Sequence, residues 1–214
     1  MSSMLQQLGQ LGIVPVIVIE DAKHAAKLAD ALVQGGLPCA EVTFRTDAAA
    51  DALRAMSDKH PNMLIGAGTV LSPRQAAAAK AAGAKFVVSP GFSPAVVDYC
   101  QEHDIPVYPG VATPTEIEMA LGKNLNTVKF FPAEPMGGLN FLKAIAAPYG
   151  MMNFIPTGGV SMKNIGEYLA FKRVIACGGT WMAPADWIAA GDFDRIKDET
   201  AKAVAAVQTI KGAA

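Results

Sequence analysis

The chain has few charged residues and no long apolar run, and each shortage excludes a class of protein. Charged side chains make up 17% of its 214 residues, and the 18 Lys and Arg against 19 Asp and Glu give a formal net charge of -1. No block of basic residues stands out, so the sequence predicts no nucleic-acid partner. No run of 18 or more apolar residues occurs, so we expect no transmembrane helix and no membrane partner.

Cysteine, histidine and targeting signals are also scarce. The segment 1–7 lacks the basic and apolar regions of a secretory signal peptide, which predicts a cytoplasmic location. The three cysteines, Cys39, Cys100 and Cys177, are far apart and odd in number, which favours buried, reduced thiols over a disulfide framework. None of the three histidines is paired at the spacing of metal ligands, so we expect no metal site.

What the chain does contain is a regular alternation of β-branched runs and Ala-rich helical stretches. The expected strands lie at residues 13–19, 40–44, 64–67, 86–89, 105–108, 127–131, 153–156 and 173–177. Between them, Ser72-Pro73, Ser93-Pro94 and Thr113-Pro114 each predict a helix start, because the hydroxyl caps the helix and proline suits its first turn. Further helices are expected near 21–35, after Thr46 or Asp47, near Ser161 and over 192–211.

Strand–helix units repeated in this way, with no linker between them, predict an α/β protein with one domain over residues 1–214, a (β/α)8 TIM barrel. An open, doubly wound sheet is the alternative. Gly66-Ala67-Gly68-Thr69 lacks the third glycine of a dinucleotide-binding fingerprint, which favours the closed barrel. In such a barrel the chemistry lies at the C-terminal ends of the strands.

A single lysine interrupts the apolar run Thr127–Phe131. Side chains alternate between the faces of a strand, so Thr127, Lys129 and Phe131 share a face that we expect to point inward. An ammonium buried without a partner shifts its pKa and neutralises. A neutral amine in a dry pocket attacks ketones, forming a carbinolamine and then a Schiff base. The alternative is that Lys129 lies at the end of its strand and extends its head group to water.

A second strand carries Glu41, Thr43 and Arg45 on one face by the same alternation. A carboxylate and a guanidinium that point into a barrel need each other or a substrate. In the functional interpretation Glu41 is the general acid/base, and Arg45 binds a substrate carboxylate with its planar guanidinium. The alternative is a structural ion pair.

Two glycine pairs follow the last two predicted strands. In (β/α)8 barrels these two loops commonly form a phosphate site, and glycine lets the backbone approach the anion closely. The alternative is that the glycines serve only tight turns. The predicted phosphate-binding residues are Thr157, Gly158, Gly159, Gly179 and Thr180. Pro90 and Phe131 are assigned to an apolar wall around the reacting carbons, with turn formation and packing as the alternative.

Six segments resemble the KDPG/KHG aldolase family, in its order and spacing and over nearly the whole chain. These are class I aldolases of 2-keto-3-deoxy-6-phosphogluconate (KDPG) and 4-hydroxy-2-oxoglutarate (KHG). The Lys129 and Glu41–Arg45 segments are the specific ones. The six segments are Glu41–Thr46, Gly66–Val70, Ser89–Gly91, Val128–Glu134, Pro156–Gly159 and Gly178–Trp181.

The resemblance implies that Lys129 is the Schiff-base lysine, that Glu41 is the acid/base, and that Arg45 with Thr69 binds the carboxylate of pyruvate. It places Thr157, Gly158, Gly159 and Thr180 at the phosphate, and it implies a homotrimer. The chain has Thr180 where members often have serine, and Phe44 where they often have leucine.

We therefore expect cleavage of KDPG to pyruvate and glyceraldehyde 3-phosphate, or of KHG to pyruvate and glyoxylate, without metal or cofactor. The preference among KDPG, its C4 epimer and KHG stays open. Two other functions remain as alternatives: a sugar-phosphate isomerase in which Lys129 acts electrostatically, and a barrel that binds phosphosugars without catalysis.

Overall fold

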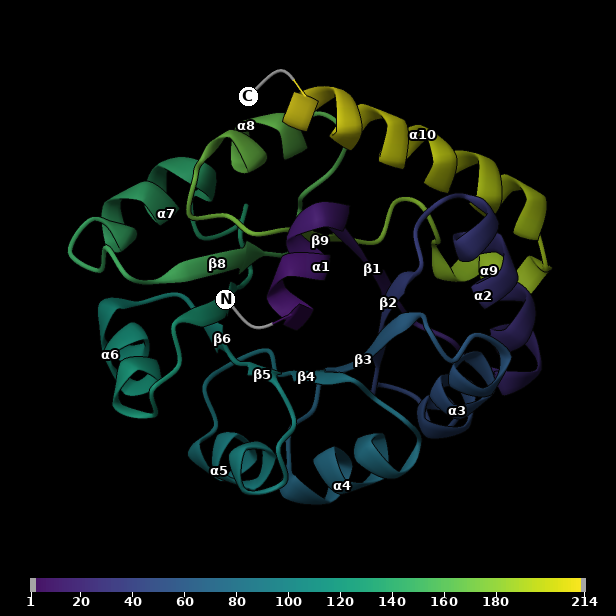
Figure 1. Cartoon of the computed structure of the whole chain (residues 1–214), viewed down its shortest axis with the longest axis horizontal. Coiled ribbons are helices and arrows are strands. Elements are labelled where there is room, and N and C mark those ends of the chain that lie inside the picture. The colour runs from purple at the N-terminus through teal and green to yellow at the C-terminus, as the bar shows by residue number, and fades with distance from the viewer. Residues whose placement is uncertain (1–2, 213–214) are drawn as a thin grey trace.

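The computed structural model describes residues 3–212. Residues 1, 2, 213 and 214, which belong to the predicted domain, lie outside them. The strands run parallel and form a ring with helices around its outside (Figure 1). The strands are β1 (Ile13–Ile17), β2 (Cys39–Thr43), β3 (Leu64–Gly68), β4 (Phe86–Val88), β5 (Val107–Tyr108), β6 (Gly110–Val111), β7 (Thr127–Phe130), β8 (Asn153–Pro156) and β9 (Cys177–Gly179).

The strands belong to two parallel sheets. The first has the order β5-β4-β3-β2-β1-β9 and the second the order β6-β7-β8. Pro109 separates β5 from β6, so one stretch of chain pairs with β4 on one side and with β7 on the other. In the described residues the chain around β8 meets the chain around β9 through isolated bridges, at Phe154–Val174 and Thr157–Gly178, rather than through a ladder. The predicted parallel α/β architecture is therefore confirmed, while the hydrogen-bonded sheet is open rather than a complete barrel.

The helices follow the strands in the predicted alternation. They are α1 (Ser3–Leu11), α2 (Ala25–Gln34), α3 (Ala49–Lys59), α4 (Pro73–Ala81), α5 (Pro94–Glu102), α6 (Pro114–Gly122), α7 (Gly138–Ala146), α8 (Ile165–Ala170), α9 (Ala185–Ala190) and α10 (Phe193–Gly212), with a 3-10 turn at Ala22–His24.

The proline-based helix starts are confirmed at α4, α5 and α6. Ser72 accepts a hydrogen bond from the Gln75 amide, whereas Ser93 makes no side-chain cap. At α6, Thr113 and Glu116 cap each other's backbone. Each such bond satisfies an amide that has no partner inside the helix, and its loss typically costs about 1 kcal/mol.

Two boundaries and one helix differ most from the sequence prediction. The last strand begins at Cys177, not near Arg173, because residues 173–176 reach β8 only through a bridge and the ladder with β1 starts at Ile13–Cys177. Helix α8 starts at Ile165 rather than Ser161, because the Asn164 side chain accepts from the Ser161 amide and holds the chain in a turn. Helix α1 was not predicted.

Helix α1 lies across the centre of the ring in Figure 1. It leads into β1 through Gly12, so it covers the N-terminal ends of the strands. Its Leu5 and Leu8 are buried. No helix in the range 3–212 is long and apolar enough to cross a membrane. Cys39, Cys100 and Cys177 are buried and unpaired, as predicted.

Candidate active site

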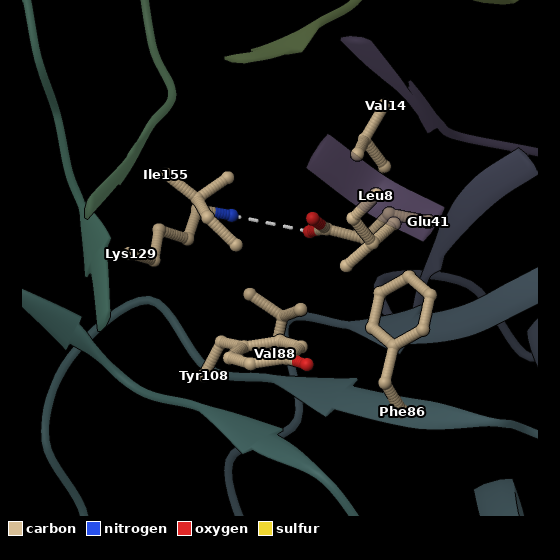
Figure 2. Close-up of a pocket in the computed structure, with 8 residues that line it drawn as sticks. All are labelled: Leu8, Val14, Glu41, Phe86, Val88, Tyr108, Lys129 and Ile155. Atoms are coloured by element: carbon tan, nitrogen blue, oxygen red, sulfur yellow. Dashed lines mark hydrogen bonds and ion pairs between the residues drawn. The ribbon is translucent and has the colours of Figure 1, made fainter. Parts of the chain in front are cut away.

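Lys129 and Glu41 meet inside the ring of strands. Their neighbours Val128, Phe130 and Val42 face the other way and are fully buried. The Lys129 Nζ atom donates to Glu41 Oε1 at 3.1 Å, and the two side chains are only 7% and 5% exposed. Figure 2 shows the two side chains pointing toward each other from opposite sides of the pocket. The amine therefore does not extend to water, and unlike the lone ammonium considered from the sequence it has a charged partner.

The pair lines a small cavity of about 10 Å³. A cavity of this size is at the lower limit for one water molecule. Its walls are otherwise apolar apart from the phenol of Tyr108, whose pKa burial raises to about 12, so it stays protonated at neutral pH. The other lining residues are Leu8, Val14, Phe86, Val88 and Ile155. Water is thus largely excluded around the amine, which strengthens electrostatic interactions there.

Gly68 makes the space that the Glu41 side chain occupies. A Cβ atom at Gly68 would lie 2.2 Å from Glu41 Oε1 and 2.6 Å from its Cγ. Gly66 does the same for the Phe86 ring, which would be 2.2 Å from an added Cβ. The Gly66-Ala67-Gly68 sequence, which lacked the dinucleotide fingerprint, therefore serves to admit two inward side chains.

Arg45 lies beyond the strand that carries Glu41. Strand β2 ends at Thr43, whose hydroxyl donates to the Ile17 carbonyl, so the alternation does not extend to Arg45. Arg45 is exposed, and its Nε donates to Thr69 Oγ1 at 3.2 Å. In the described part of the chain Arg45 takes part in no ion pair, so its guanidinium remains available to an external anion.

Thr69 has a left-handed backbone, with φ of 55°. This conformation is costly for a β-branched residue, and such strain clusters at functional sites. It occurs where the chain leaves β3, at the same end of the sheet as Arg45. The two residues assigned to carboxylate binding are therefore in contact.

The two glycine pairs lie side by side. Thr157 forms a bridge with Gly178, and Gly158 and Gly159 adopt φ of 98° and 83°. The Thr157 hydroxyl is buried and has no hydrogen-bond partner. A buried hydroxyl without a partner is costly, which suits a site completed by a ligand.

Gly179 and Thr180 differ in their surroundings. Thr180 is exposed at the end of β9. Gly179 is buried beneath the Trp181 ring, which would be 1.8 Å from an added Cβ. Packing of Trp181 is therefore a sufficient reason for a glycine at this position, apart from any anion.

Pro90 and Phe131 lie near the lysine in different ways. The Phe131 ring centroid is 5.2 Å from Lys129 Nζ, which is a cation–π contact. The Pro90 carbonyl packs on Gly110, the residue that pairs with Lys129 across β6 and β7.

Sequence reasoning missed Leu8 and Tyr108, which line the cavity beside Lys129. Two signals in the sequence could have found them. Strand alternation turns Tyr108 inward, and Leu5 and Leu8 have the spacing of one helix face.

An amine and a carboxylate buried together in the interior of a parallel α/β fold are the two groups that an enzyme forming Schiff bases with carbonyl compounds needs. Among residues 3–212 no three His, Cys, Asp or Glu side chains gather as metal ligands. The family model for KDPG and KHG aldolase matches residues 4–199. The chain belongs to this family.

Several aldolases match the sequence of this chain along nearly their whole length. A 2-dehydro-3-deoxy-phosphogluconate aldolase of Treponema pallidum (strain Nichols) is 50% identical over 196 residues, which are 92% of this chain and 93% of that protein. The KHG/KDPG aldolase of Escherichia coli (strain K12) is 45% identical over 192 residues, 90% of each. The crystal structure of a KDPG aldolase from Legionella pneumophila, with pyruvate captured as a covalent carbinolamine, superposes with a TM-score of 0.90 at 38% identity, covering 94% of this chain and 98% of that one.

Proposed function

We propose that the chain is a class I aldolase that cleaves KDPG to pyruvate and glyceraldehyde 3-phosphate, and KHG to pyruvate and glyoxylate. The buried contact of 3.1 Å between Lys129 and Glu41 carries the proposal. It supplies a nucleophile and a proton carrier within hydrogen-bond reach of each other. Membership of the aldolase family supports the same reaction.

The first half of the reaction captures the ketone. Glu41 accepts a proton from Lys129, whose free amine attacks C2 of the substrate. Glu41 then returns a proton to the C2 hydroxyl of the carbinolamine, and water leaves to give the iminium. Arg45 and Thr69 hold the substrate carboxylate, which fixes C2 against the amine.

The second half breaks the carbon–carbon bond. Glu41, or a water that it holds, removes the proton of the C4 hydroxyl. The electrons of the C3–C4 bond move into the iminium, which releases the aldehyde and leaves an enamine. The enamine is protonated at C3, the future methyl group of pyruvate, and the iminium is hydrolysed. The iminium provides the electron sink, so the scheme uses no metal or cofactor.

The remaining assignments complete the proposal. The turn of Thr157, Gly158 and Gly159 binds the phosphate together with Gly179 and Thr180, and Pro90 and Phe131 border the reacting carbons. The bridges between β8 and β9, and the continuous chain from β5 to β6, support a single-domain (β/α)8 barrel over residues 1–214. The proposal also includes a cytoplasmic location, which the N-terminal segment and the unpaired cysteines favour, and a homotrimer, which the family resemblance implies.

Borohydride reduction in the presence of pyruvate tests the mechanism. We expect a mass increase equal to reduced pyruvate on the peptide that contains Lys129, and irreversible loss of turnover. Lys129→Ala is expected to abolish both the adduct and proton exchange into the methyl group of pyruvate. Turnover that survives reduction would instead support an isomerase, and saturable binding without proton exchange would support a non-catalytic barrel. Loss of turnover on adding EDTA would contradict the metal-free scheme.

A further inference from the structure

The segment that follows the Lys129 strand is bonded to the glycine turn after β8. The Ala133 amide donates to the Thr157 carbonyl at 2.8 Å, and the Glu134 amide donates to the Gly158 carbonyl at 2.9 Å. These two bonds continue the pairing of β7 with β8 beyond the end of either strand. The position of residues 133–134 therefore sets the position of the turn.

The Glu134 side chain lies against the same turn. A Cβ atom at Gly159 would be 2.5 Å from Glu134 Cβ and 2.6 Å from its Cγ. The stem of Glu134 thus occupies the space that any side chain at Gly159 would need. With φ of 83° at Gly159, this close packing leaves glycine as the residue that fits.

The carboxylate of Glu134 is held by a buried phenol. The Tyr168 hydroxyl, on α8, donates to Glu134 Oε1 at 2.5 Å, and Tyr168 is only 1% exposed. This length is typical of a strong hydrogen bond to a charged acceptor. Burial first, and the Glu134 carboxylate second, raise the pKa of Tyr168, so the phenol remains a donor at neutral pH.

A third contact holds the turn from the side of α8. Asn164, which precedes α8, donates to the Gly159 carbonyl at 3.2 Å and accepts from the Ser161 amide at 2.8 Å. The turn is thus fixed on one side by Glu134 and on the other by Asn164. Neither contact uses the amides of Gly158 and Gly159, for which the described residues offer no acceptor.

We propose that Tyr168 and Glu134 are positioning residues that hold the Gly158–Gly159 turn in the shape that binds the substrate phosphate. The hydrogen bond from Tyr168 also holds the Glu134 carboxylate against α8. The negative charge of Glu134 is thereby kept from turning toward the bound anion. The pair thereby favours phosphorylated over unphosphorylated keto acids, although neither residue touches the reacting carbons. This inference rests on the proposed function and on its phosphate site.

The test compares two substrates that differ in the phosphate. For Tyr168→Phe we expect the KM for KDPG to rise about tenfold with kcat unchanged, because a displaced binding group weakens binding without altering the amine. The kcat/KM for KHG, which has no phosphate, should stay within about twofold. Glu134→Gln keeps an acceptor oxygen for Tyr168, so its KM for KDPG should lie between those of the unaltered protein and Tyr168→Phe.

Tyr149→Phe is the matched control. It removes another hydrogen bond from a tyrosine to a glutamate, the 2.9 Å bond to Glu118, and should change neither substrate's constants. An equal loss on both substrates in Tyr168→Phe, or no loss on either, would overturn the proposal.

Two measurements on the unaltered protein distinguish an error in the role of Tyr168 and Glu134 from an error in the proposed aldolase function. If it cleaves neither KDPG nor KHG, the proposed function is wrong. If it cleaves them but inorganic phosphate does not compete with KDPG, the phosphate site and the positioning role fail together, while the aldolase reaction stands.

Discussion

Replacing Gly68 with alanine adds one methyl group at the wall of the site. The new Cβ would lie 2.2 Å from Glu41 Oε1 and 2.6 Å from Glu41 Cγ, well inside van der Waals contact. Glu41 has little free space, since its side chain is 5% exposed and the adjoining cavity measures about 10 Å³. The carboxylate must move, and the oxygen that meets the new methyl group is the one that accepts from Lys129.

The expected magnitudes differ for folding and for catalysis. Overpacking by one methyl group in a core typically costs about 1–3 kcal/mol of folding free energy, and a flexible carboxylate can relieve part of it. General acid/base catalysis contributes about 100-fold to 10,000-fold in rate. We therefore expect Gly68→Ala to remain folded and to lose about 100-fold or more in kcat, because the proton carrier is displaced.

Urea unfolding and steady-state cleavage of KDPG measure the two effects on the same preparation. Gly122→Ala, at the end of α6, is the control, because nothing lies within 4 Å of an added Cβ there. It should keep full activity. If Gly68→Ala cleaves KDPG at the unaltered rate, the space at Gly68 does not place Glu41, and the reasoning is refuted.

Three further perturbations test the site and its surroundings. Lys129→Met leaves the Glu41 carboxylate buried without its partner, so the free energy of unfolding in urea should fall by about 3–5 kcal/mol. Adding Glu41→Leu should recover much of that loss, and a double variant as unstable as the single one would contradict this account. Arg45→Lys removes the planar guanidinium and should raise the KM for both keto acids about tenfold. If the variant has the same KM values as the unaltered protein, Arg45 does not bind the carboxylate. Burial raises the pKa of Tyr108 from about 10 to about 12, so the folded state keeps a proton that the unfolded state loses. The free energy of unfolding should therefore fall as pH rises from 10 to 12, and Tyr108→Phe should flatten this fall in urea titrations at each pH; an unchanged slope would exclude Tyr108 as its source.

The inward position of the lysine could be predicted because alternation is a local property of a strand. Val128 and Phe130 are fully buried on one face of β7, and Lys129 lies on the other. The same rule placed Glu41 inside. The rule does not by itself position Arg45, because β2 ends at Thr43, and where a strand ends depends on its neighbours as well as on its own sequence.

Other features depend on contacts between distant residues and could not be predicted. The role of Gly68 depends on a glutamate in the neighbouring strand, and the role of Gly179 on the ring of Trp181. A Gly-Gly sequence is equally compatible with a phosphate site and with close packing. One of the two breaks between the sheets arises at Pro109, where one chain segment pairs first with β4 and then with β7.

The position of helix α1 bears on the order in which the two products leave the site. Because α1 covers the N-terminal ends of the strands and its Leu8 lines the cavity beside Lys129, that end of the ring is closed, and we infer that the substrate and both products pass through the opposite end. In the proposed reaction the half of the substrate bonded to Lys129 lies deeper than the half that becomes the aldehyde. The aldehyde therefore departs first, and its departure admits the water that hydrolyses the pyruvate iminium. A single entrance thus makes the release of products sequential.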